Sequence, residues 1–173
     1  MFINPLRAAG WPAHRDTEPA WRGGAPIERD GRGFDEEFGC QPGDHDFVAL
    51  RAAFRATGGI ARGADLACTL AQRRRGDIAS LARLIVGAEI FSFEWDDTFW
   101  VPMFQFVPGA LAVKPGPRQV LAELSRVYDG WTLAVWFARP NSWLNGCRPV
   151  DRLDADLPTV LAAARADRFI ATA

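Results

Sequence analysis

The sequence has few of the residues from which metal and catalytic sites are usually built. It contains two histidines, His14 and His45, and three cysteines, Cys40, Cys68 and Cys147, among 173 residues. The cysteines are odd in number and scattered, without a C-x-x-C pair, which is typical of a reduced protein rather than of a disulfide framework or a zinc site. We therefore predict a cytoplasmic protein that binds no metal.

Catalytic signatures are also absent. No G-x-S-x-G, H-E-x-x-H, P-loop or Rossmann fingerprint occurs. The run Asp44-His45-Asp46 is more typical of a polar helix start than of a metal or acid–base cluster, since adjacent residues seldom converge on one ion. The glycines of GGIARG (58–63) stand between two predicted helices, without the preceding strand that a dinucleotide site needs. We therefore predict a non-enzymatic protein that uses no cofactor.

Long apolar segments are missing as well. No run of about 18 apolar residues exists, so we expect no membrane span. The first residues, MFINPLRAAGWPAHRD, lack the apolar core of a signal peptide. Apolar residues make up 49% and charged residues 24% of the chain, an ordinary composition for a soluble globular protein. A chain of this length can bury one sizeable core.

The net charge of −1 is unevenly distributed. Residues 1–46 carry five arginines against nine acidic residues (−4), residues 47–89 seven arginines against three (+4), and residues 91–173 eight basic residues against nine (−1). The basic segment makes nucleic-acid binding an alternative function. Its contacts would come from Arg73, Arg74, Arg75 and Arg83, around a helix–Gly76–helix unit. This function ranks second, because the second helix offers only one good outward contact, Arg83.

Hydrophobic periodicity predicts an α+β fold that is mostly α-helical, with one aromatic-rich β-hairpin and an irregular N-terminal arm. Residues 1–45 form the arm, residues 46–110 contain helices plus the hairpin, and residues 111–173 form a helical C-terminal region. Residues 46–173 are expected to make one compact domain. Helices are expected at about 47–55, 64–75, 78–89, 117–128, 131–138, 150–153 and 157–169.

Start signals support these helices. Asp77 and Asp156 are expected N-caps, and Asp44 or Asp46 is expected to cap the first helix. In the third helix, Ile78 is expected to face inward together with Leu81, Ile85 and Ala88.

The stretch IFSFEWDDTFWVPMFQF (90–106) switches to strand-like alternation. A two-residue turn at Asp96-Asp97 would pair Trp95 with Thr98, Phe93 with Trp100 and Phe91 with Pro102, so that the aromatic side chains share one face. Acidic residues around this face disfavour base stacking, and we expect it to pack on the helices. A small-ligand pocket beneath the hairpin is a further alternative function.

The stretch WFARPNSWLNGCRPVDRL (136–153) carries a chain of stop and start signals. Pro140 ends a helix, Asn141 can cap the next turn, Gly146 allows a left-handed end, and Pro149 starts another turn. This corner is expected to hold Trp143 and Leu144 against the core and to position the last helix.

The corner resembles the C-terminal toxin-binding domain of the Xre/MbcA/ParS-type antitoxin family, over about residues 117–169. The matching residues are Trp136, Phe137, Pro140, Asn141, Leu144, Gly146, Pro149, Val150, Asp151 and Leu153. The sequence departs from that family in the hairpin that precedes this region and in a final helix without the usual terminal glycine.

The resemblance implies a helical module that binds and blocks a cognate toxin, often one with an NAD-consuming RES domain. Partner contacts are expected on the last helix, at Arg165, Asp167, Arg168 and Phe169, with the corner as their scaffold. Its alanines would allow close approach of another backbone. The arm and the aromatic content also suggest a homodimer.

Overall fold

The computed structural model describes residues 43–173. The predicted arm therefore lies outside the described residues except for its last three positions. Within the described part the chain is mostly helical and has a small three-stranded antiparallel sheet, which confirms the predicted α+β class. No helix among residues 43–173 is long and apolar enough to span a lipid bilayer.

All seven predicted helices are present, with ends that differ by a few residues from those expected. The elements follow one another as α2 (Asp44–Phe54), η1 (Arg55–Thr57), β1 (Ile60–Arg62), α3 (Gly63–Gln72), α4 (Ile78–Val86), β2 (Phe93–Trp95), β3 (Thr98–Pro102), η2 (Met103–Gln105), α5 (Pro115–Leu124), α6 (Gly130–Ala138), η3 (Ser142–Leu144), α7 (Pro149–Arg152) and α8 (Leu157–Thr172).

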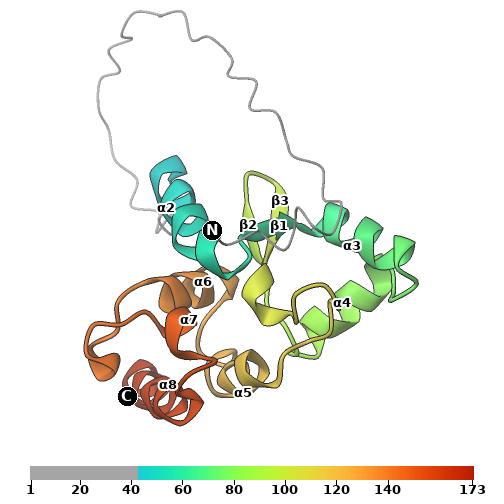
Figure 1. The fold of residues 1–173 in the computed structure, drawn as a ribbon. Coiled ribbons are helices and arrows are strands. Elements are labelled where there is room, and N and C mark those ends of the chain that lie inside the picture. Colours follow the sequence, from blue (N-terminus) through green and yellow to red (C-terminus); the bar gives the residue numbers. More distant parts are fainter. Residues whose placement is uncertain (1–42) are drawn as a thin grey trace, which may run out of the picture.

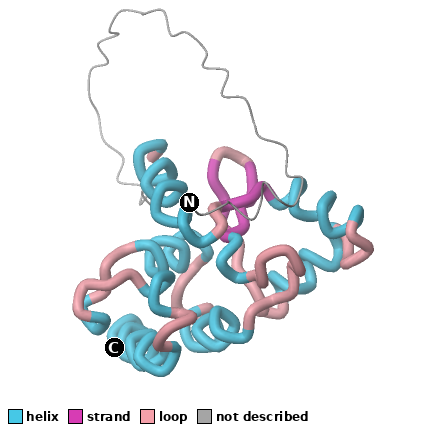
Figure 2. Tube along the Cα trace, viewed as in Figure 1, coloured by secondary structure: helices cyan, strands magenta, loops and turns pink. Residues whose placement is uncertain are grey.

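The sheet stands near the middle of the molecule, between α2 on one side and α3 on the other (Figure 1). Helix α6 packs against both α2 and β2, whereas α3 packs against α4. Helix α8 lies along α5 at the end of the molecule opposite the hairpin tip (Figures 1 and 2). The last helix is therefore held by helix α5 and not by the sheet.

Two of the three predicted hairpin pairs are present; the third is not, because Phe91 lies before β2 and Pro102 pairs with Ile60 instead. Trp95 pairs with Thr98, and Phe93 pairs with Trp100. Asp96 and Asp97 both have φ near +51°, as a type I′ turn requires. The aromatic face is covered by Phe47 of α2, whose ring stacks on Trp95 with centroids 3.8 Å apart. The prediction that this face packs on the helices is thus confirmed.

Strand β1 corrects the prediction of a single hairpin. Its three residues pair with β3, from Ile60 opposite Pro102 to Arg62 opposite Trp100, so β3 is the central strand. The GGIARG stretch was expected only to separate two helices, and three strand residues between glycines carry too little alternation to show a strand. Gly58, in the left-handed region at φ +106°, turns the chain out of η1 and into this strand.

Two of the expected helix caps are present and one is wrong. Asp77 accepts a hydrogen bond from the Ser80 N–H, and Asp156 accepts one from the Thr159 N–H. The pKa of both carboxyl groups lies below the usual value of 3.8, chiefly because of the hydrogen bond from the Ser80 N–H to Asp77 and of the hydrogen bond between the Thr159 side chain and Asp156. Helix α2 is instead preceded by Gly43 without a side-chain cap. Asp44 and Asp46 lie in its first turn, where their charges favour the positive end of the helix dipole.

Ile78 also differs from the prediction. It is the first residue of α4 and is 54% exposed, whereas Leu81 of the same helix is fully buried. The partly buried residues of α4 that pack beside Leu81 are Leu84 and Ile85. The inward stripe therefore begins at Leu81, one turn later than expected.

Apolar side chains are buried in two clusters. The main core joins α2, the hairpin and α5–α8; its largest buried side chains include Phe54, Phe91, Phe104, Leu121, Phe137 and Val160. The second core joins β1, α3, α4 and the end of β3; it is made of Ala61, Leu66, Ala67, Leu70, Leu81, Ile90, Val101, Met103 and Phe106. The segment 90–106 contributes to both, and so it connects them.

Gln105 is the one buried polar residue of the described chain, and it lies where the two cores meet. Its carboxamide oxygen accepts the Phe91 N–H at 2.7 Å, and its amide nitrogen donates to the Phe91 and Pro102 carbonyl oxygens, both at 3.0 Å. One side chain therefore bonds to three backbone groups, two of Phe91 and one of Pro102. A buried group left without such a partner would cost about 1–3 kcal/mol.

We expect the substitution Gln105→Leu to lower the free energy of unfolding by about 3 kcal/mol, because it leaves the Phe91 and Pro102 backbone groups buried without partners. Urea denaturation measures this change. Gln72→Leu, at an exposed glutamine at the end of α3, serves as the control and should change stability by less than about 0.5 kcal/mol. Equal effects of the two substitutions would contradict the assigned role.

Candidate partner-binding site

The corner at residues 136–153 is tied to the last helix through one carboxylate. Oδ2 of Asp167 accepts the indole N–H of Trp136 at 2.7 Å and the Asn141 amide at 2.8 Å. Its other oxygen accepts the indole N–H of Trp143 at 3.0 Å. Three donors from α6 and the corner thus converge on one side chain of α8. We call this arrangement the Asp167 clamp.

The turn signals of the corner act largely as predicted. The Asn141 side chain accepts the Trp143 N–H at 2.8 Å, and Leu144 is buried in the main core. The left-handed positions are Asn145 and Gly146, at φ +53° and +76°, so two residues rather than one make the reversal. Pro140 is exposed at the end of α6.

Trp143 does not pack in the core as expected. Its side chain is 54% exposed, because its ring lies on α8, where its N–H meets Asp167. The sequence pattern could not distinguish a core tryptophan from one held at the surface by a hydrogen bond.

The second half of the corner is tied to α2. Pro149 is buried at the start of α7, and Arg148 forms a two-pronged ion pair with Asp151, at 2.6 and 3.0 Å. The remaining nitrogen of Arg148 donates to the Ala53 carbonyl oxygen at 3.2 Å. Asp151 therefore orients an arginine that reaches a helix 95 residues earlier in the chain. Sequence reasoning missed Arg148, because nothing local marks its distant acceptor.

Two of the predicted partner contacts are used inside the molecule. Arg165 donates to Glu123 of α5 at 2.8 Å, and Arg168 donates to the other oxygen of the same carboxylate. The hydrogen bond from Arg165, with further help from the charge of Arg168, holds the pKa of Glu123 below its usual 4.5. Ala163 and Ala164 are buried in the main core, so these alanines serve packing within the chain. Glu123 was also missed, since its partners lie more than 40 residues away in the sequence.

Asp167 also affects the pKa of Tyr128, which lies between α5 and α6. Burial, and then the negative charge of Asp167, raise the pKa of Tyr128 above its usual 10.0.

The remaining predicted contact, Phe169, is open to solvent. Phe169 is 73% exposed and the following Ile170 is 63% exposed. Both lie within one turn of Asp167, which anchors the exposed Trp143 to the same part of α8. We call Trp143, Phe169 and Ile170 the apolar tip. All three are large apolar side chains exposed near the last turns of α8, and such side chains are candidates for contact with a partner.

The predicted nucleic-acid contacts are not presented together. Arg73 donates to the Gly109 carbonyl oxygen and so ties α3 to the loop before α5. Arg74, with φ +51°, and Arg75 are exposed in the turn that joins α3 to α4.

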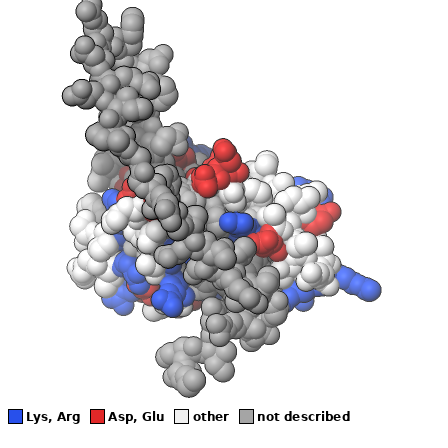
Figure 3. Space-filling view, turned by 90° about the horizontal axis from the view of Figure 1, so that it is seen from above, with Lys and Arg blue, Asp and Glu red and all other residues white. Residues whose placement is uncertain are grey.

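The fourth of these arginines, Arg83, contacts residues of its own helix, α4. Arg83 points its guanidinium at the Ala79 carbonyl oxygen, 3.3 Å away, and at the Ser80 hydroxyl, 3.4 Å away. The most exposed apolar residue of the same helix is Val86, at 88%. On the face shown in Figure 3, basic and acidic side chains are interspersed wherever described atoms are visible. This arrangement does not favour a nucleic-acid surface.

Metal and acid–base groups do not gather in the described residues. Asp44, His45 and Asp46 are exposed in the first turn of α2. Among residues 43–173 no three histidine, cysteine or acidic side chains lie close enough together to hold an ion.

No family model, no curated protein and no solved structure matches this chain. The function must therefore follow from the geometry of the site and from the resemblance of the corner motif.

We expect Asp167→Asn to lower the free energy of unfolding by about 2 kcal/mol. The amide keeps one acceptor oxygen but turns its NH₂ toward donors that it cannot pair with. Urea denaturation measures the change. Asp154→Asn is the matched control, since Asp154 is 77% exposed and its single ion pair should contribute less than about 1 kcal/mol. Equal unfolding midpoints for the two variants would argue against the clamp.

The lowered pKa of Glu123 predicts a pH-dependent contribution to stability. A carboxyl group with a depressed folded-state pKa stabilises the fold above its ordinary pKa and loses that contribution as the pH falls through the lower value. The difference in unfolding free energy between wild type and Glu123→Gln should therefore be largest at neutral pH and shrink as the pH falls below about 4.5. Urea titrations across this range measure it, and a constant difference would contradict the assignment.

Proposed function

We propose that the chain is a non-enzymatic protein-binding module of the antitoxin type, and that it presents the apolar tip to a cognate toxin. The observation that carries the proposal is the exposure of Trp143, Phe169 and Ile170 at one end of α8. Tryptophan and phenylalanine side chains at the centre of an interface contribute much of its binding energy, provided that they need little ordering on binding.

The surroundings of the apolar tip support this role. Trp143 is already fixed by its hydrogen bond to Asp167, and α8 is held on α5 by the two arginines that bind Glu123. A partner would therefore meet side chains on a rigid helix end and would pay little entropy to order them. The resemblance of the corner to the toxin-binding domain of the antitoxin family agrees with this placement.

The contacts differ in kind from those expected from the sequence. Arg165, Asp167 and Arg168 position α8 through side-chain bonds within the chain, although the Arg165 side chain is itself 60% exposed, and Phe169 projects to solvent. Removal of residues 155–173 would also remove Val160, Ala163 and Ala164 from the main core. Point substitutions at the tip therefore test binding better than a deletion does.

The test is co-expression of the full chain with the product of the adjacent open reading frame, read out by co-purification and by rescue of growth. The double substitution Phe169→Ser with Ile170→Ser should weaken the complex at least about tenfold, because it removes two apolar side chains that the complex would bury. Val86→Ser on α4, at 88% exposure, is the matched control and should leave the complex intact.

Two results would contradict the proposal. One is undiminished co-purification and rescue with the double tip variant. The other is a change from dimer to monomer in the double tip variant without any captured toxin, measured by light scattering. That result would assign the apolar tip to a homodimer interface.

A further inference from the structure

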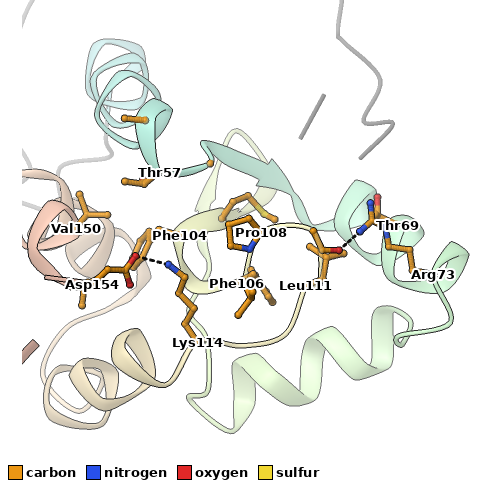
Figure 4. Close-up of a pocket in the computed structure, with 16 residues that line it drawn as sticks. Thr57, Thr69, Arg73, Phe104, Phe106, Pro108, Leu111, Lys114, Val150 and Asp154 are labelled. Carbon is orange, nitrogen blue, oxygen red and sulfur yellow. Dashed lines mark hydrogen bonds and ion pairs between the residues drawn. The ribbon is translucent and has the colours of Figure 1, made fainter. Parts of the chain in front are cut away.

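A cavity of about 270 Å³ lies between the two cores, beside the loop that follows η2 (Figure 4). Its apolar wall comes from Met103, Phe104, Phe106, Leu111, Val150 and Leu153. The cavity lies beside the segment that follows the hairpin. The small-ligand pocket that the sequence offered as an alternative was expected beneath the aromatic face of the hairpin instead. At the roughly 30 Å³ that one water molecule occupies in the liquid, the cavity has room for about nine waters or for one small organic molecule.

Lys114 supplies a cation in this apolar wall (Figure 4). Its backbone N–H donates to the Gln105 carbonyl oxygen at 2.8 Å, which fixes the residue beside the junction of the cores. Its side chain is only 22% exposed, and its ammonium group contacts Asp154 Oδ2 at 2.8 Å. An ammonium group has three donors, and among the described residues only this one carboxylate accepts from it.

The two side chains of the Lys114–Asp154 ion pair differ in their exposure to solvent. The Asp154 side chain is 77% exposed, so water competes for its oxygens, whereas the lysine stem is buried against the cavity wall. Exposed ion pairs of this kind contribute little and exchange partners readily. Lys114 is also the one lysine in the sequence, where nineteen other basic residues are arginines. A compact ammonium group on a flexible stem can follow a ligand in a way that a planar guanidinium cannot.

We propose that this cavity binds a small monocarboxylic acid of about ten non-hydrogen atoms in all, with an apolar body, and that Lys114 binds its carboxylate. The apolar body would occupy the space among the aromatic and aliphatic side chains, where it is removed from water. The carboxylate would accept from the ammonium group in place of Asp154 or beside it.

The test uses octanoate as the probe and octanol as its uncharged counterpart. Reductive methylation with a carbon-13 label marks Lys114 without removing its charge, and its signal is distinct from that of the chain's α-amino group. Octanoate should shift the Lys114 methyl signal saturably, with a stoichiometry of one by calorimetry and a rise in melting temperature. Octanol should bind at least about tenfold more weakly.

Substitutions in the unlabelled protein separate the contributions. Lys114→Met keeps the apolar stem and should weaken octanoate binding about tenfold, whereas Asp154→Asn removes the competing negative charge and should strengthen it. Val107→Trp, at a residue that lines the cavity and is 39% exposed, should abolish binding without disturbing either core. Arg118→Met is the control: Arg118 is an exposed cation paired with Glu89 outside the cavity.

Three results would overturn the proposal. These are the absence of any saturable shift at millimolar octanoate, equal affinities for octanoate and octanol, and undiminished binding by Val107→Trp. None of them bears on the apolar tip, because the cavity residues and the tip residues do not overlap.

Discussion

The side-chain amide of Gln105 is hydrogen-bonded at the junction of two apolar cores, and the placement of both depends on it. Phe91 and Phe104 belong to the main core, whereas Met103 and Phe106 belong to the second. By joining Phe91 to Pro102, the amide fixes the distance between the chain that enters the hairpin and the chain that leaves it. The backbone carbonyl of Gln105 also holds Lys114, so one residue positions the hairpin, the cavity and the approach to α5.

The Asp167 clamp also holds separate segments of the chain together, but it does so at the surface, where its hydrogen bonds compete with water. Gln105 is neutral and fully buried, so its hydrogen bonds compete with no solvent and their loss leaves backbone groups that water cannot reach. Asp167 is charged and only partly buried, and water could replace each of its three donors at modest cost. The amide therefore determines whether the chain folds this way, and the carboxylate determines how firmly the corner holds α8.

Local signals were enough for much of the fold. Asp77 and Asp156 mark helix starts because a cap needs only a residue and the next turn, and the register of the hairpin follows from alternation around Asp96 and Asp97. The features that the sequence did not predict depend on residues that lie far apart in the sequence. Strand β1 is recognisable only beside β3, and Glu123 matters only beside two arginines of α8. The sequence placed the expected partner contacts on the last helix, but it could not show which of their side chains bond to Glu123 and to the corner.

The cavity and the apolar tip lie at opposite ends of the same helix. Asp154 stands just before the cap of α8, whereas Phe169 and Ile170 are near its last residues, and a helix of 16 residues spans about 24 Å. Between them Val160, Ala163 and Ala164 are buried in the main core. Coupling between two sites requires an element that has two discrete arrangements. Helix α8 is packed through its buried alanines on α5, which gives it a single arrangement. Occupation of the cavity should therefore leave the apolar tip in place, so each site can be judged from its own variants.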